Sequence, residues 1–292
     1  MLEVPVSAKT PGQTWKIFCR CSGAVDAPWL TLLHGFPTCS WDYARIAPGL
    51  ESSSRVLAFD FLGFGDSDKP RSFPYSISLQ ADVTEAVWQC FGVRRSCIVA
   101  HDYGTSVAQE LLARQAEGRL ATEIAAVTFL NGALYADLHR PLAIQRLLRR
   151  PVVGPLLAAL ASERMFRRNF CKVFSVNHQP AGEELKQHWS AIARRGGHRL
   201  AHRLIHYIGD RERHHERWEA ALESARVPMN FVWGMEDPVS GAHVAERIRA
   251  RLPEADLVEL AGVGHYPQIE APERVVPEVE RVTCRKAAPA GG

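Results

Sequence analysis

Apolar residues recur along this chain in short runs with the length and the β-branched or aromatic content of buried strands. After a hairpin-like start, each run is followed by a glycine-rich turn and then by a helical pattern. Such alternation is typical of a mostly parallel sheet with helices on both faces. The runs that predict strands are Trp15–Cys21, Trp29–Leu33, Arg55–Phe59, Ser96–Ala100, Ile124–Leu130, Met229–Trp233 and Asp256–Leu260.

One interval breaks this alternation, because residues 133–225 contain helical patterns and no strand pattern. A helical insertion of about 90 residues between two strands is typical of a lid or cap. The sequence therefore predicts a core domain made of residues 1–132 and 226–286, a helical cap of residues 133–225, and a disordered tail of residues 287–292. Within the cap, the apolar run Pro151–Ala161 is expected to form a buried helix.

Composition narrows the class of protein. With 292 residues, 46% of them hydrophobic, the chain suits a folded α/β domain and excludes a disordered protein. A net charge of +3 gives no reason to expect nucleic acid as a partner. The seven cysteines form no CxxC pairs and favour a reducing cytoplasm. No apolar run approaches the ~20 residues of a membrane span, so a soluble protein without an integral membrane segment is expected.

Charge is unevenly distributed along the chain. Residues 133–224 contain 16 Lys and Arg, nine Asp and Glu, and eight of the twelve histidines, so this segment carries +7 and the remainder −4. Solvated arginines on exposed helix faces are the expected explanation, and an acidic membrane surface or an anionic ligand is the alternative.

A candidate nucleophile follows the strand Ser96–Ala100. The sequence AHDYG (residues 100–104) places one reactive residue between small neighbours, directly before an amphipathic helix. This is the pattern of a nucleophile elbow, a tight turn that presents one side chain above the sheet. The residue presented here is Asp102, for which a helix N-cap is the alternative role.

The turn HGFP (residues 34–37) follows the strand Trp29–Leu33 and predicts an oxyanion hole. Its two donors would be the backbone N–H groups of Phe36 and of Tyr103, the residue after Asp102. The remaining residues that we expect to contact the substrate are His34, Gly35, Pro37, Trp41 and Tyr135.

Two further residues complete a candidate catalytic triad. Asp237 follows the strand Met229–Trp233, and His265 lies in a glycine-rich loop after the last strand. The order nucleophile, acid, histidine is that of α/β-hydrolases. Glu236 is a weaker candidate for the acid, and a simple Asp-Pro turn is the other explanation for Asp237.

Together these motifs resemble α/β-hydrolases with an aspartate nucleophile, the epoxide hydrolases and haloalkane dehalogenases, and most of all the mesoderm-specific transcript-like proteins. The resemblance covers most of residues 28–275. It rests on the segments HGFPT (34–38), DFLGFGDSDKP (60–70), HDYG (101–104), VAQELL (107–112), HRPL (139–142), DPV (237–239) and HYPQ (265–268). It implies an α/β-hydrolase fold, with a mostly parallel eight-stranded sheet and an inserted helical cap, and no cofactor.

Departures from these families favour one reaction. Haloalkane dehalogenases carry Asn and Trp where this chain has Phe36 and Tyr103, so a halide would lack its usual side-chain donors. Epoxide hydrolases use the HGFP turn and protonate the epoxide oxygen with cap tyrosines. Tyr207 is the candidate, because it lies beside an apolar helix face formed by Leu200, Leu204 and Ile208. A core aromatic residue is its alternative role.

The expected function is opening of a small organic substrate, most simply an epoxide to a diol. Asp102 would form a covalent ester, and water activated by His265 would hydrolyse it. Dehalogenation with the same nucleophile, a hydrolase or lyase that uses Asp102 as a base, and a non-enzymatic binding protein are the alternatives. The oligomeric state stays open.

No metal site is expected. His198, His202 and His206 recur every four residues, but no Cys or carboxylate is placed to complete a site. Cys39 lies near the HGFP turn without an elbow around it, so we expect a buried thiol.

Overall fold

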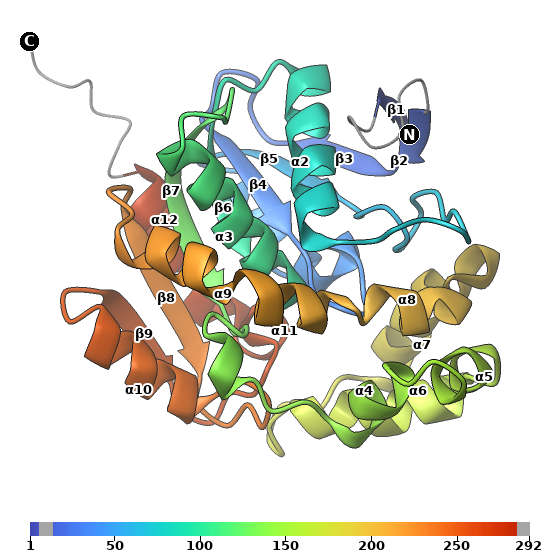
Figure 1. The fold of residues 1–292 in the computed structure, drawn as a ribbon. Coiled ribbons are helices and arrows are strands. Elements are labelled where there is room, and N and C mark those ends of the chain that lie inside the picture. The colour runs from blue at the N-terminus through green and yellow to red at the C-terminus, as the bar shows by residue number, and fades with distance from the viewer. Residues whose placement is uncertain (6–13, 285–292) are drawn as a thin grey trace, which may run out of the picture.

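The structure is a computed structural model that describes residues 1–5 and 14–284. The predicted tail, residues 287–292, lies outside the described residues. The main sheet has the strand order β3-β5-β4-β6-β7-β8-β9, in which only β3 runs antiparallel to its neighbour (Figure 1). Its strands are β3 (Cys19–Ser22), β4 (Trp29–Leu33), β5 (Arg55–Phe59), β6 (Arg95–Ala100), β7 (Glu123–Leu130), β8 (Met229–Gly234) and β9 (Asp256–Leu260). The mostly parallel sheet confirms the predicted fold class.

The predicted number of eight strands in one sheet is wrong for the described residues, where the main sheet has seven. The expected strand Trp15–Cys21 is divided at Phe18 into β2 (Thr14–Ile17) and β3, and β2 pairs with β1 (Leu2–Pro5) in a separate sheet. The Phe18 N–H donates to the Ser67 hydroxyl and the Lys16 N–H to the Asp68 carboxylate. The Asp60 and Asp68 N–H groups donate in return to the Phe18 and Lys16 carbonyls, so the loop after β5 pairs with residues 16–18 and the predicted strand is divided.

Helices cover both faces of the sheet, because its strand residues alternate between two apolar cores. Leu57 and Phe59 belong to the core under α2, α3 and α10, whereas Val56 and Ala58 belong to the core under α1 and α12. The core helices are α1 (Ala47–Leu50), α2 (Ile77–Phe91), α3 (Tyr103–Ala116), α10 (Ala242–Arg251), α11 (Pro267–Glu270) and α12 (Pro272–Cys284). A 3-10 helix, η1 (Ser40–Tyr43), precedes α1.

Between β7 and β8 the chain forms helices, which we call the helical insertion (residues 133–225). Its elements are η2 (Ala136–Leu138), α4 (Ala143–Leu148), α5 (Val153–Ala159), α6 (Glu163–Phe170), η3 (Cys171–Val173), α7 (Gly182–Ala193), η4 (Arg194–Leu200), α8 (Ala201–Leu204) and α9 (Tyr207–Glu223). In Figure 1, α4 to α8 form a layer below the sheet, and α9 runs along α3.

The apolar run Pro151–Ala161 differs from the prediction of a buried helix. Ala158 is buried on α5, but Val152, Leu156 and Leu160 are exposed. A single short helix at the edge of the insertion has a partner on one face only, so its other face stays in contact with solvent. Within residues 1–5 and 14–284, no helix combines the length and apolar character needed to cross a bilayer.

Candidate active site

The elbow between β6 and α3 is held in a left-handed conformation, with Asp102 at φ 47° and ψ −105°. Non-glycine residues pay a steric cost at positive φ, so surrounding contacts must hold the turn. The Asp102 N–H donates to the Asn131 carbonyl over 2.9 Å, and the Thr105 hydroxyl donates to the Asp102 carbonyl. A Cβ on Gly104 would lie 2.2 Å from the Leu33 carbonyl oxygen, so only glycine fits there.

The HGFP turn places a donor directly on the Asp102 side chain. The Phe36 N–H donates to Oδ1 of Asp102 over 2.8 Å. Tyr103 is the first residue of α3, and the first N–H groups of a helix have no partner within it. The geometry thus supplies one of the two predicted oxyanion donors, and the role of the Tyr103 N–H stays a prediction.

His265 lies between two carboxylates. Its Nδ1 is 2.7 Å from Oδ2 of Asp237, and its Nε2 is 3.5 Å from Oδ2 of Asp102. All three side chains are buried, whereas Glu236 is exposed. The structure therefore brings together Asp102, His265 and Asp237, and leaves out the weaker candidate for the acid.

Three residues that the sequence analysis missed hold this arrangement. Ser240 donates its hydroxyl to Oδ2 of Asp237 over 2.6 Å, and the Asn131 amide donates to the same oxygen over 3.0 Å. The His101 ring bonds through Nε2 to the His265 carbonyl over 2.8 Å. Asn131 comes directly after β7, at the same sheet edge as the triad, which is the signal that could have identified it.

The charges at the site favour an ionised Asp102 beside a protonated His265. Burial alone would raise the pKa of Asp102, but the hydrogen bond and charge of His265, with Arg211, hold it well below its usual range. Burial likewise opposes the charge on His265, yet Asp237 and Asp102 raise its pKa to about 10. The same histidine lowers the pKa of Asp237 despite burial.

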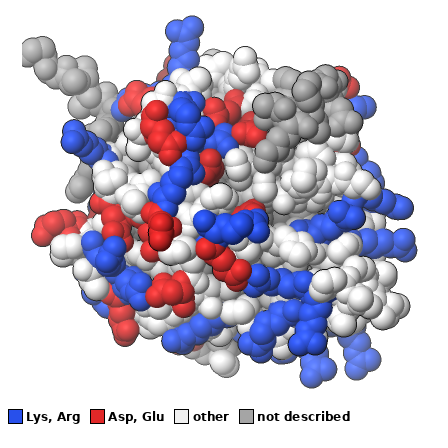
Figure 2. All heavy atoms as spheres, viewed as in Figure 1, with Lys and Arg blue, Asp and Glu red and all other residues white. Residues whose placement is uncertain are grey.

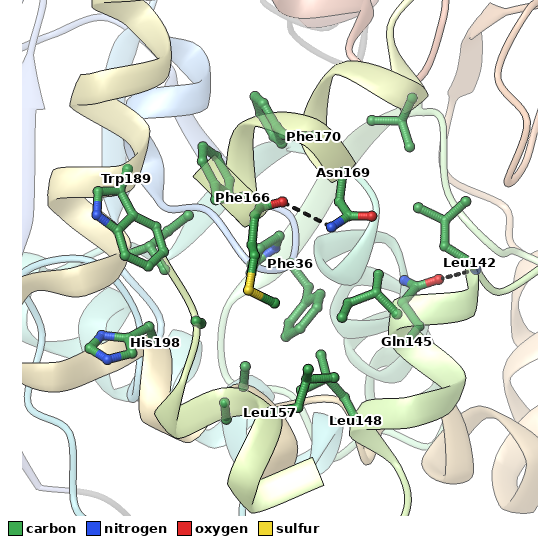
Figure 3. A pocket seen from close by; sticks show the side chains of 18 of the residues that line it. Phe36, Leu142, Gln145, Leu148, Leu157, Phe166, Asn169, Phe170, Trp189 and His198 are labelled. Atoms are coloured by element: carbon green, nitrogen blue, oxygen red, sulfur yellow. Dashed lines mark hydrogen bonds between the residues drawn. The ribbon is translucent and has the colours of Figure 1, made fainter. Parts of the chain in front are cut away.

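A cavity of about 160 Å³ opens above these groups. Its floor includes Asp102, His265, Tyr266, Phe36 and Pro37, and its walls come from the helical insertion. Figure 3 shows Phe36 near the centre of the cavity, between Phe166 and Trp189 on one side and Leu148 and Leu157 on the other. An apolar cavity with a carboxylate on its floor suits a small apolar substrate.

Of the five predicted substrate contacts, only Pro37 lines this cavity. His34 is buried below, where its Nε2 accepts the Phe61 N–H, and Gly35 contacts His101 too closely to admit a side chain. Trp41 is 43% exposed on η1, and Tyr135 packs under the Arg247 guanidinium. These four residues do not line the cavity, because their positions support the turn or lie outside the walls, and their contact with the substrate stays a prediction.

Tyr207 lies close to the nucleophile without lining the cavity. Its ring centroid is 5.7 Å from that of Phe36 and 5.0 Å from that of Tyr103. Its buried hydroxyl has no hydrogen-bond partner in the described chain. Burial, followed by the charge of Asp102, raises its pKa, so the hydroxyl keeps its proton. Tyr266, which the sequence analysis did not consider, is the tyrosine that lines the cavity.

The helical insertion also contributes Arg211, which nothing in the sequence pattern indicated. Its Nη2 donates to the Asp102 carbonyl over 3.0 Å and its Nε to the Ser106 hydroxyl over 2.6 Å. A cation on α9 thus ties the insertion to the back of the elbow. His139, between η2 and α4, is half-buried, and both its ring nitrogens are enclosed and unpartnered in the described chain. Burial, with the charge of Arg211, lowers its pKa to about 3.

The three regularly spaced histidines lie on different elements. His198 lines the cavity on η4, His202 lies on α8, and His206 precedes α9. Among residues 1–5 and 14–284, no group of three or more His, Cys, Asp or Glu side chains could hold a metal ion. Cys39 is buried as expected, and burial raises its pKa.

Comparison with known proteins agrees with this geometry. The model of the alpha/beta hydrolase fold family matches residues 28–272. A putative hydrolase, LipZ of Mycobacterium tuberculosis, is 40% identical over 90% of each chain, and the human mesoderm-specific transcript homolog protein is 39% identical over 88% of this chain and 79% of its own. The crystal structure of a putative ancestral haloalkane dehalogenase superposes with a TM-score of 0.80 at 23% identity, covering 99% of this chain and 100% of that one. With the elbow, the triad order and the parallel sheet, these matches confirm the resemblance seen in the sequence: the chain belongs to the α/β-hydrolase fold family.

Proposed function

We propose that this hydrolase opens a small apolar epoxide to a diol through a covalent ester on Asp102. The observation that carries the proposal is that the two carboxylate oxygens of Asp102 have different surroundings. Oδ1 is held by the Phe36 N–H, whereas Oδ2 lies 3.5 Å from Nε2 of His265. A carboxylate held in this way presents one oxygen for attack on an alkyl carbon and keeps the other in the oxyanion hole.

In the first step, Oδ2 of Asp102 attacks an epoxide carbon, and the ring oxygen leaves with a proton from a buried acid. Tyr207 is the proposed acid, because its hydroxyl is unpartnered in the described chain and lies within the field of Asp102. Tyr266, on the cavity floor, is the rival donor. The helical insertion acts as the cap that excludes bulk water during this step.

In the second step, His265 takes a proton from water, which attacks Cγ of the ester, and negative charge develops on Oδ1 beside the Phe36 N–H. The tetrahedral intermediate then breaks its Cγ–Oδ2 bond, and the diol leaves with Oδ2 and the proton from His265. The second proton of the water restores the tyrosine hydroxyl and leaves Asp102 ionised. Ester formation itself prepares this base. It removes the charge of Asp102, one of the groups that raise the pKa of His265, so the histidine deprotonates more easily in the intermediate. Asp237 keeps the ring oriented through Nδ1.

Two alternatives are less well supported. A halide would need side-chain N–H donors beside Asp102, but Phe36 has no polar side-chain atom and Tyr103 carries a hydroxyl at the far edge of its ring in place of an N–H. A lyase that uses Asp102 as a base conflicts with the low pKa of that carboxylate, since a strongly acidic group is a weak base.

The deciding experiment mixes the enzyme with a racemic aryl epoxide, such as styrene oxide, and follows the intact protein mass and diol formation together. A transient mass increase equal to one epoxide, mapped to the peptide that contains Asp102, supports the proposal. Diol formation with no adduct, under rapid quenching, would replace it with direct attack by water. The proposed location is the cytoplasm, with a small molecule as substrate and no nucleic acid as partner.

A further inference from the structure

An apolar stripe on α5 faces solvent. Val152, Leu156 and Leu160 are 83%, 62% and 66% exposed, and they recur every four residues along one helix face. Single exposed apolar residues are ordinary on protein surfaces, whereas a continuous stripe indicates a contact surface. The opposite face of the same helix carries Leu157 and Ala158, which line the active-site cavity.

Positive charge surrounds this stripe. Residues 139–206 contain 13 Lys and Arg against three Asp and Glu, although the whole chain carries only +3. Figure 2 shows blue side chains gathered over the helical insertion, at the lower right, around a group of uncoloured ones. Several of these cations are exposed and have no ion-pair partner in the described part of the chain: Arg146, Arg150, Arg164, Arg168, Arg199 and Arg203.

We propose that this face, α5 with its flanking arginines, docks on an anionic lipid bilayer. Apolar side chains enter the boundary between headgroups and acyl chains, while arginines beside them bind lipid phosphates. The positive charge of the arginines favours an anionic surface as the partner, because lipid phosphates would neutralise side chains that otherwise repel one another. An apolar substrate also concentrates in the bilayer. With the face docked, only the width of α5 would separate the bilayer from the active-site cavity. Docking does not depend on the reaction proposed above.

The test is co-sedimentation of the full chain with vesicles of phosphatidylcholine, or of phosphatidylcholine with about 30% phosphatidylglycerol. We expect at least tenfold stronger partitioning onto the anionic vesicles, and loss of most of this preference at about 0.5 M salt. Equal partitioning onto both vesicle types, or none, would overturn the proposal.

Variants locate the surface. Leu156→Asp with Leu160→Asp removes the stripe, and Arg150→Glu with Arg164→Glu reverses two cations; each pair should weaken anionic binding at least tenfold. The matched controls, Val25→Asp and Arg20→Glu, replace exposed residues outside the helical insertion, and these variants should bind like the wild type. All four proteins should keep the wild-type circular dichroism spectrum and melting temperature, which shows that the fold is intact. Unchanged binding by both insertion variants would overturn the proposal. A dimer that forms without lipid and that Leu156→Asp with Leu160→Asp abolishes would also overturn it, because the stripe would then be the contact surface between two copies of the chain.

Discussion

Asp102 and His265 face one another across 3.5 Å, with Oδ2 of the carboxylate directed at Nε2 of the ring. Oδ1 of the same carboxylate is held by the Phe36 N–H, so the two oxygens of Asp102 have different surroundings. The proposed mechanism assigns them different fates, which isotopes can follow.

A single turnover in ¹⁸O-labelled water should give a diol without label and an enzyme with one ¹⁸O in Asp102. The reason is that the hydroxyl added to the substrate comes from Oδ2, while water attacks Cγ and replenishes the carboxylate. Mass spectrometry of diol and protein measures both. Label in the diol of the first turnover would contradict a covalent ester.

Replacing the base should trap the intermediate. His265→Gln leaves Asp102 free to attack but removes the group that activates water, so an adduct of substrate mass should accumulate while turnover falls by ~10²-fold or more. Intact-mass measurement checks this, with Asp102→Asn as the control that forms no adduct. A His265→Gln protein that remains unmodified during incubation with a wild-type substrate would rule out the two-step scheme.

The two steps should respond differently to pH. Asp102 stays ionised well into acid because its pKa is depressed, whereas His265 must lose its proton before it can activate water. The ester should therefore accumulate as pH falls and disappear as pH rises, with a midpoint below the pKa of about 10 of the free enzyme. Quenched-flow mass spectrometry from pH 5 to about 9 measures the ester fraction. An ester that builds up toward alkaline pH would show that another group is the base.

Tyr207→Phe tests the proposed acid. Because the hydroxyl has no partner in the described chain, its loss should change the free energy of unfolding by less than ~1.5 kcal/mol. Epoxide turnover should fall by ~10²-fold or more, the scale expected for a positioned acid. Tyr266→Phe is the matched comparison, and a larger loss in that variant would transfer the role to Tyr266.

Halide release completes this comparison. The wild type should release bromide from 1,2-dibromoethane slowly or not at all, since Phe36 and Tyr103 stand where haloalkane dehalogenases carry the Asn and Trp that hold the halide. Rapid bromide release, together with an unaffected Tyr207→Phe enzyme, would favour a dehalogenase.

Arg211 is a positioning residue that acts through the elbow. Arg211→Met should lower kcat more than it raises KM, and should move the acidic limb of the kcat/KM profile to higher pH, because a cation that lowers the pKa of Asp102 is lost. Arg211→Lys should restore the limb in part. Arg213, exposed two residues later, provides the control Arg213→Met, whose profile should match the wild type. A loss of stability in Arg211→Met without a shifted limb would leave only a structural role.

The sequence predicted most of the strands and singled out the three residues of the candidate triad because both depend on local patterns. Asp102, Asp237 and His265 each follow a strand, and parallel strands bring their carboxyl ends to one edge. Arg211 and the walls of the cavity could not be predicted in this way, because they depend on how the helical insertion folds back onto α3. The positions of Trp41 and Tyr135 could not be predicted for another reason: proximity to a motif along the chain does not determine which way a side chain points.

The glycines packed around Asp102 determine which positions of the elbow can accept a substitution. Any side chain at Gly104 would collide with the Leu33 carbonyl, and one at Gly35 would press against His101 and Asp102. The Asp102 side chain itself lines the floor of the cavity. A single substitution at residue 102 can therefore change the side chain at the centre of the site while the backbone of the elbow stays the same. New chemistry is thus most accessible at residue 102, although the proposed reaction depends on its aspartate.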